Sequence, residues 1–196
     1  NGELLARCTL SAERTLPGQA APVETVHFTG NVRLTQEPAK KEKIKEDVSP
    51  AEHQLGHDTV YSFYFHGPAY QVVEAAWRNG DGSTTRMTDP LPDNHTPADK
   101  PLLASPRLVE LCFQTAGLWE AGRDGRLALP MGVESAEMVS SEATGRLVAH
   151  AKRRADGPFD VVVSDEKGRV IVKLNGYSTS PMPSALPPEI EEPLRA

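Results

Sequence analysis

An apolar segment near the middle of the chain constrains the fold more than any other feature. Residues 108–119 form a long run of mostly apolar side chains. Ser105 is a favourable N-cap, Pro106 suits the first helical position, and Gly122 predicts a helix end. A helix that is apolar on nearly all sides is a buried helix. The sequence therefore predicts one long helix in the interior of the protein.

Glu110 and Gln114 carry a carboxyl and a carboxamide within this run. They stand four residues apart, which places them on the same face of the helix. Burial disfavours the charged form of a carboxyl group, and a protonated carboxyl can act as a general acid. Our hypothesis is that Glu110 belongs to a functional site. The alternative is a structural carboxyl satisfied by local hydrogen bonds, with Gln114 as a satisfied buried amide.

Alternation of apolar and polar residues predicts strands on both sides of the helix. The predicted strands span residues 4–10, 26–34, 126–138, 146–152, 159–164 and 170–174. We expect Leu129-Pro130 to break the third strand, and the turn Asp165–Gly168 to join the last two as a hairpin. A sheet wrapped around a single apolar helix satisfies both elements. This is an α+β arrangement of the hot-dog type.

The chain is expected to divide into four parts. Residues 1–36 hold two strands that cannot bury their apolar face alone, and 37–57 read as a charged linker. Residues 58–180 form the main domain, in which Gly67-Pro68 predicts a turn and 79–106 a long loop. Residues 181–196 are rich in Pro and Glu, which is typical of an interdomain linker. Because the sequence starts at Asn1, we expect a piece of a larger polypeptide.

Composition narrows the classes of partner and compartment. The formal net charge is −6, and both signs are spread along the chain. No basic face is apparent, so nucleic acid and anionic membrane are not expected as partners. Cys8 and Cys112 are the two cysteines, and Cys112 lies in the predicted core, which favours a reducing cytoplasm. We expect neither a signal peptide nor a membrane-spanning segment.

Three segments in order resemble the polyketide synthase dehydratase family, a double hot-dog fold. Residues 65–71 (Phe-His-Gly-Pro-Ala-Tyr-Gln) resemble its Tyr-Gly-Pro-x-Phe-Gln motif, and residues 108–114 resemble its Leu-Leu-Asp-x-x-x-Gln helix. Residues 129–134, with the hairpin at 159–176, resemble its closing strands. The resemblance implies the C-terminal half of a double hot dog at 58–180 and trailing strands of the N-terminal half at 1–36.

This resemblance implies a function for several residues. Such domains remove water from a β-hydroxyacyl thioester on the phosphopantetheine arm of an acyl carrier protein, giving an enoyl thioester. By position, Glu110 would be the acid and Gln114 its orienting partner. His66, Gly67, Pro68 and Tyr70 would contact substrate; these four are substrate-binding candidates. We expect no cofactor and no metal. The expected partners are the carrier protein, other domains of the megasynthase and a second copy in a homodimer.

The sequence departs from the family pattern in three places. Glu110 stands where the family has Asp, and His66 replaces a Tyr. The family's proton-abstracting histidine is followed by Gly four positions later, and none of the six histidines here fits that pattern. We therefore expect the catalytic histidine upstream, and the present chain to be inactive by itself.

Other functional interpretations remain open. The chain could be a non-catalytic hot-dog module that spaces domains or holds an acyl chain, or a cyclising or isomerising relative, because a fold alone does not fix a reaction. Glu52, His53 and His57 have helical metal-ligand spacing, but no third strong ligand in a buried setting, so a solvated linker is favoured. Cys112 is interpreted as a core residue.

Overall fold

The computed structural model describes residues 2–37, 39–45, 51–100, 102, 104–188 and 195. The chain forms two compact units, Asn1–Ala39 and Lys40–Ala196. No helix in the described ranges is long and apolar enough to cross a membrane.

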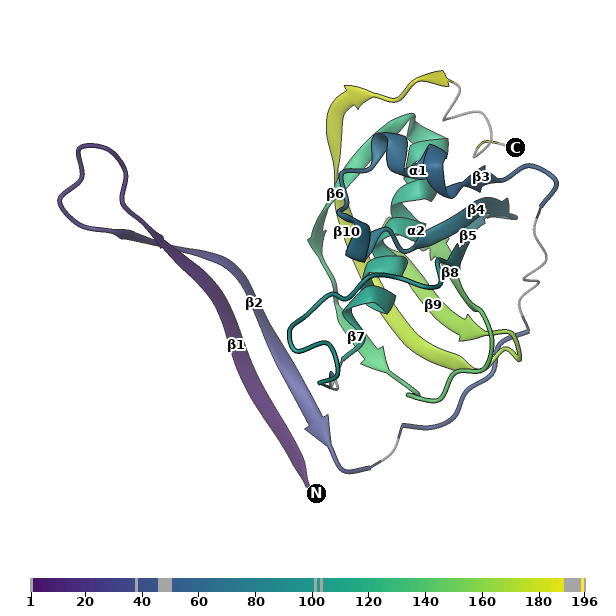
Figure 1. The fold of residues 1–196 in the computed structure, drawn as a ribbon, viewed down its shortest axis with the longest axis horizontal. Helices are drawn as coiled ribbons and strands as arrows, with labels where there is room; N and C mark the ends of the chain where they lie inside the picture. The colour runs from purple at the N-terminus through teal and green to yellow at the C-terminus, as the bar shows by residue number, and fades with distance from the viewer. Residues whose placement is uncertain are drawn as a thin grey trace. The chain divides into compact units, whose positions relative to one another are not determined.

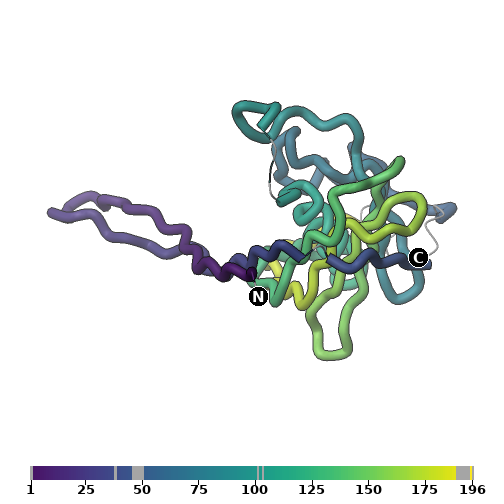
Figure 2. Tube along the Cα trace, turned by 90° about the horizontal axis from the view of Figure 1, so that it is seen from below, coloured from purple at the N-terminus to yellow at the C-terminus, as the bar shows by residue number. Residues whose placement is uncertain are grey.

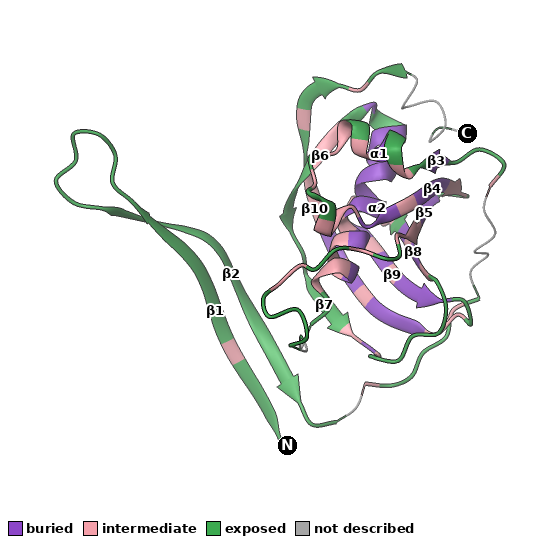
Figure 3. Cartoon of the chain, in the orientation of Figure 1, coloured by how far each residue is buried: buried purple, intermediate pink, exposed green. Residues whose placement is uncertain are grey.

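The first unit is a two-stranded antiparallel hairpin of β1 (Glu3–Arg14) and β2 (Val23–Thr35), which confirms both predicted strands. Its register pairs Ala6 with Val32 and Leu10 with Phe28, so apolar side chains share one face. That face is solvated within the unit, because Leu10 is 59% exposed and Phe28 66% exposed. Figure 2 shows the purple trace turning back on itself once, and Figure 3 shows both strands as almost wholly exposed.

The second unit is an antiparallel sheet curled around one helix (Figure 1). The sheet order is β3-β4-β5-β8-β9-β10-β6, with β7 also paired to β10. The elements are β3 (Leu55–Gly56), α1 (His57–Phe63), the 3-10 helix η1 (Pro68–Tyr70), β4 (Val73–Asn79), β5 (Gly82–Met87), α2 (Pro106–Asp124), β6 (Arg126–Gly132), β7 (Ser135–Met138), β8 (Leu147–Arg153), β9 (Phe159–Asp165) and β10 (Val170–Ala185). This confirms the predicted α+β arrangement.

The helix α2 fills the centre of the curled sheet, as predicted. Leu111 and Leu118 are 0% exposed and pack into the main core cluster. Burying each such side chain contributes roughly 1.5–3 kcal/mol. The helix continues past the predicted end at Gly122 and stops at Gly125, whose φ of 61° is the left-handed conformation of a C-terminal cap. Gly122 itself is buried inside the helix.

The predicted loop at 79–106 contains a strand, β5, so that prediction is wrong between Gly82 and Met87. Ser83 and Thr85 are polar but buried. Their hydroxyls pair with Thr115 of α2, where the Ser83 hydroxyl donates to the backbone carbonyl and Thr85 bonds the side chain. A buried hydroxyl is tolerated when it is hydrogen-bonded. Alternation of apolar and polar residues in the sequence does not reveal a strand buried in this way.

The segment after the helix also differs from expectation in its boundaries. The strand break falls between β6 and β7, at residues 133–134, rather than at Leu129-Pro130. Strand β10 runs to Ala185 instead of ending before the Pro-rich tail. Pro181 of β10 pairs with Ala128 of β6. The pairing of β10 with β9 ends at Tyr177, so β10 has an open side at Pro181, where a missing N–H is tolerated.

Part of the predicted charged linker belongs to the second unit. Lys43 forms a bridge with Arg169 in the turn between β9 and β10, and Glu42 lies 3.1 Å from the amine of Lys173. Leu55 is 4% exposed in β3. Residues 46–50 of this linker lie outside the described residues.

Candidate functional site

Glu110 and Gln114 share one face of α2, as the helical spacing predicted, but the carboxyl of Glu110 is only partly buried. Glu110 and Gln114 face the same way, and the amide nitrogen of Gln114 donates to Oε1 of Glu110 at 3.0 Å. The Gln114 residue is 2% exposed, whereas the Glu110 side chain keeps 22% of its surface exposed. The carboxyl group therefore sits at the rim of the core, with its neighbour one turn later fully inside.

His66 reaches Glu110 from the loop between α1 and η1. Its Nε2 lies 3.0 Å from Oε1 of Glu110, and its side chain is 18% exposed. The ring stacks on Phe65 with centroids 5.0 Å apart, and its backbone carbonyl accepts a hydrogen bond from Gln71. Nδ1 of His66 is buried and has no hydrogen-bond partner among the residues that the structure describes. The imidazole is thus anchored by its neighbours while one ring nitrogen faces the carboxyl.

Both polar atoms of the Gln114 side-chain amide form hydrogen bonds. Its nitrogen also donates to the carbonyl of Tyr70 at 3.0 Å, and its oxygen accepts from the Tyr61 hydroxyl at 2.6 Å. With both N–H groups and the oxygen engaged, the amide has one orientation that satisfies its contacts. Gln114 therefore fixes where Oε1 of Glu110 can lie.

Tyr61 is a site residue that the sequence did not single out. Its hydroxyl accepts a hydrogen bond from the backbone N–H of Val73 at 2.8 Å while donating to Gln114. Burial raises the pKa of the Tyr61 phenol far above its usual value, the hydrogen bond from Val73 opposes that shift, and Glu110 adds to it. Tyr61 consequently stays protonated and remains a donor.

Tyr64, a second tyrosine close to Tyr61 in the sequence, also contacts α2. The Tyr64 hydroxyl lies 3.4 Å from the carbonyl of Gln114, and burial raises its pKa well above the usual value. The hydroxyl lies beside Gly117 of α2, where a Cβ would come within 2.7 Å of the hydroxyl oxygen. The absence of a side chain at Gly117 therefore lets Tyr64 approach the helix.

The remaining predicted residues lie on and beside η1. Gly67 caps this 3-10 helix, Pro68 begins it and Tyr70 ends it. The Tyr70 carbonyl binds Gln114, while its hydroxyl lies 3.4 Å from the side-chain amide nitrogen of Asn94. A Cβ at Gly67 would meet open space. Tyr70 is thus joined to the Glu110 network through its backbone, whereas Gly67 and Pro68 shape the turn.

Glu110 carries its described contacts on one oxygen. Gln114 and His66 both address Oε1. Within the described part of the chain no hydrogen bond reaches Oε2, and the side chain is partly exposed. One carboxyl oxygen is therefore fixed and the other is accessible, which suits proton transfer to or from an external group. Two hollows of about 340 and 610 Å³ lie elsewhere on the domain, and Glu110 lines neither.

Comparison with known proteins decides the family. The model of the polyketide synthase dehydratase N-terminal domain matches residues 37–189. The chain belongs to the polyketide synthase dehydratase family. A curated relative, polyketide synthase ThaG of Burkholderia thailandensis, is 29% identical over 116 residues, covering 58% of this chain and 2% of that protein. The chain therefore spans a small part of its curated relative.

Solved structures confirm the hot-dog fold of this dehydratase-family chain. A trans-AT polyketide synthase dehydratase domain from Brevibacillus brevis matches with a TM-score of 0.66 at 16% identity, covering 90% of this chain and 65% of that one. The dehydratase domain from the CurF module of curacin polyketide synthase matches with a TM-score of 0.65 at 18% identity, covering 91% and 64%. The chain thus spans about two thirds of the length of these solved domains.

Proposed function

We propose that this chain is part of a dehydratase domain that removes water from a β-hydroxyacyl thioester borne by an acyl carrier protein. The observation that carries the proposal is the carboxyl of Glu110, fixed through Oε1 by Gln114 and left accessible at Oε2. Membership of the dehydratase family supports the reaction class.

In this mechanism Glu110 acts as the general acid. The protonated carboxyl donates its proton to the β-hydroxyl of the substrate as the C–O bond breaks and water leaves. A base removes the α-proton, the C–H electrons form the new double bond, and an enoyl thioester results. Gln114 holds the acid in place, and Tyr61 holds Gln114.

The base of this reaction is assigned to another part of the intact protein. Two solved relatives that match this fold are CurK dehydratase variants described as inactive, one with an aspartate replaced by asparagine and one with a histidine replaced by phenylalanine. We assign the role of that aspartate to Glu110 and expect the histidine upstream of the present chain. The chain by itself is then inactive.

The same proposal assigns the parts of the chain to the two halves of a double hot dog. Residues 58–180 correspond to the C-terminal hot dog of a double hot dog, and 1–36 to trailing strands of the N-terminal one. The matched family model is named for an N-terminal domain, so this assignment rests on the order of the motifs at 65–71, 108–114 and 159–176. The carrier protein's phosphopantetheine arm, other domains of the megasynthase and a second copy are the proposed partners, in the cytoplasm.

The test supplies the upstream segment that is proposed to carry the histidine. The chain is extended with its natural upstream sequence and assayed by mass spectrometry for loss of water from a 3-hydroxyacyl thioester. Glu110→Gln should lower the rate at least about 100-fold, because removal of a general acid costs that much. Glu52→Gln, which changes an exposed glutamate, should leave the rate unchanged. An extended chain in which Glu110→Gln keeps full activity would refute the assignment.

A second candidate is a non-catalytic module that holds an acyl chain. The observation in its favour is the 3.0 Å contact between His66 and Glu110, which engages the carboxyl with a residue that the family does not have there. The variant His66→Tyr, which restores the family residue, distinguishes this candidate from the dehydratase proposal. If it raises dehydration, His66 holds Glu110 in a non-catalytic state. A cyclising relative would instead add an internal hydroxyl of an enoyl thioester across its double bond, which gives a ring-closed product of unchanged mass.

A further inference from the structure

A cationic cleft lies at the opposite end of α2 from Glu110. It has a volume of about 610 Å³ and is formed by the β4–β5 turn, the last turns of α2 and the β8–β9 turn. Arg123 is 13 residues beyond Glu110, so the cleft is roughly 20 Å from the carboxyl along the helix. Five cationic side chains line the cleft, against the two carboxylates of Asp81 and Asp156.

Three of these cations surround one indole ring. The guanidinium carbons of Arg123, Arg153 and Arg78 lie 5.0, 5.3 and 5.4 Å from the ring centroid of Trp119. Each contact is a cation–π interaction. The ring is held in place because its N–H donates to the carbonyl of Asp81 at 2.8 Å. Trp119 therefore brings three like charges within about 10 Å of one another, a separation at which they repel.

The arginines nearest the indole are not neutralised by strong ion pairs. Arg78 and Arg153 donate to backbone carbonyls, those of Gly80 and Gly157. Neither of them, nor Lys152, has a carboxylate within ion-pair distance in the described part of the chain. Arg123 has one at 3.7 Å, on the adjacent Asp124. Asp81 acts on Arg78 and Glu120 on Arg153 through space, without an ion pair, so the positive charge of the cleft is only partly compensated.

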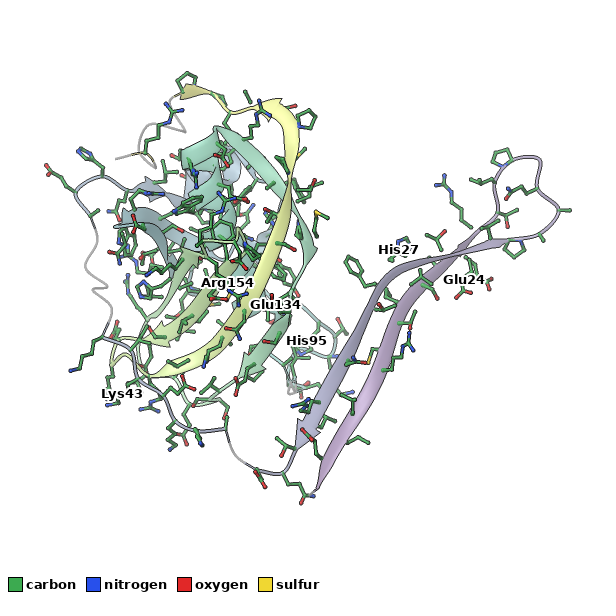
Figure 4. The ribbon with its side chains drawn as sticks, turned by 180° about the vertical axis from the view of Figure 1, so that it is seen from behind. Glu24, His27, Lys43, His95, Glu134 and Arg154 are labelled. Atoms are coloured by element: carbon green, nitrogen blue, oxygen red, sulfur yellow. The ribbon has the colours of Figure 1, made fainter. Side chains whose placement is uncertain are left out.

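The fifth cation differs in this respect. The Arg154 guanidinium lies 2.7 Å from Asp160 and 3.0 Å from Glu134. Figure 4 labels Arg154 and Glu134, which lie beside each other. Those two carboxylates satisfy Arg154, so the available charge belongs to the arginines around Trp119 and to Lys152.

The electrostatics of Arg78 agree with this geometry. Burial lowers the pKa of its guanidinium, Asp81 opposes that shift, and the positive charge of Arg123 adds to it. An arginine remains charged at neutral pH even so. An anion in the cleft would be stabilised by several guanidinium groups at once.

We propose that this cleft binds a phosphoryl group. Guanidinium forks match phosphate oxygens in bidentate geometry, and three forks that line one cleft suit a tetrahedral anion better than a planar carboxylate. The volume falls within the range of small-molecule sites, so it admits a phosphate together with an attached organic group. The phosphoryl group comes either from a free phosphorylated compound or from the phosphodiester of a pantetheine arm.

Nuclear magnetic resonance of the indole N–H groups tests the proposal directly on this chain. The chain has two tryptophans, and Trp77 is 2% exposed and outside the cleft. Inorganic phosphate, titrated against chloride at constant ionic strength, should shift the Trp119 resonance saturably and leave that of Trp77 in place. A shift that equal chloride reproduces, or one without saturation, would overturn the proposal.

Two variants and a control test whether the phosphate binds in the cleft. Arg123→Gln changes a side chain that is 55% exposed, so folding should be unaffected, and it should weaken phosphate binding about 10-fold. Adding Arg153→Gln should abolish binding. Arg146→Gln removes an arginine that pairs with Glu74 outside the cleft and should change nothing. Equal affinity in Arg123→Gln and Arg146→Gln would contradict the site.

A second titration distinguishes the two sources of the phosphoryl group. Phosphopantetheine that binds about 10-fold tighter than phosphate, with the same dependence on Arg123, identifies the arm; equal affinities identify recognition of the phosphoryl group alone. Pantetheine without phosphate is the control. If it binds as tightly as phosphopantetheine, the cleft does not recognise phosphate. None of these measurements depends on dehydration, so the cleft and the proposed function fail separately.

Discussion

Glu110 and Glu120 are two carboxyl groups on the same buried helix with different surroundings. Glu120 is 8% exposed and accepts hydrogen bonds from the Thr179 hydroxyl at 2.8 and 2.9 Å. Burial raises its pKa, Thr179 and then Arg153 oppose that shift, and Asp124 adds to it. Glu110 is more exposed but lies in a network of an amide, an imidazole and a phenol. Burial alone therefore does not single out Glu110; the proposal that it is the acid rests on its oriented contacts and its accessible oxygen.

The largest effect is expected from shortening the acid of this pair. Glu110→Asp keeps the carboxyl but withdraws it by one methylene from Gln114 and His66. A misplacement of about 1 Å costs on the order of 100-fold in rate. The dehydration rate of the extended chain measures this. A variant as fast as the parent would show that the contacts of Glu110 do not set its position.

A smaller effect, on stability, is expected from changing a tyrosine that supports the Glu110 network. Tyr61→Phe removes the hydrogen bond to Gln114 and leaves the N–H of Val73 without its acceptor. An unsatisfied buried donor costs about 1–3 kcal/mol of unfolding free energy. Tyr64→Phe loses a contact of 3.4 Å and should cost less. Denaturant unfolding of both variants checks the order, and a reversed order would contradict the network.

The smallest effect concerns the pH dependence of stability at the other carboxyl. Because the folded-state pKa of Glu120 is raised, its protonated form favours the folded chain at low pH. That contribution is lost as the pH rises through the folded-state pKa. Glu120→Gln cannot ionise, so its stability relative to the parent should increase between about pH 4 and about pH 8. Thermal unfolding at both pH values measures the difference, and a decrease would contradict the burial of Glu120.

Much of the fold could be predicted because local patterns agreed with it. The apolar run around Leu111 and Leu118 predicted α2, and alternation predicted the hairpin at Asp165–Gly168 as well as β1 and β2. Strand β5 was missed because Ser83 and Thr85 are polar and are satisfied by Thr115 across the core. That pairing depends on tertiary contact and leaves no hydrophobic period.

The candidate site was predictable along the helix and not across it. Glu110 and Gln114 are four residues apart, so helical geometry places them together. Tyr61 is 53 residues from Gln114, and nothing in its local sequence distinguishes it from the aromatic residues beside it. The contact of His66 with Glu110 likewise depends on how the loop before η1 folds over the helix.

The most direct test of the central claim compares the two carboxyls in one assay. Glu110→Gln and Glu120→Gln are introduced separately into the extended chain, and dehydration of the same 3-hydroxyacyl thioester is timed for folded samples of each. The account predicts that Glu110→Gln is at least about 100-fold slower and that Glu120→Gln keeps the parent rate. Equal rates in the two variants, or a loss confined to Glu120→Gln, would contradict it.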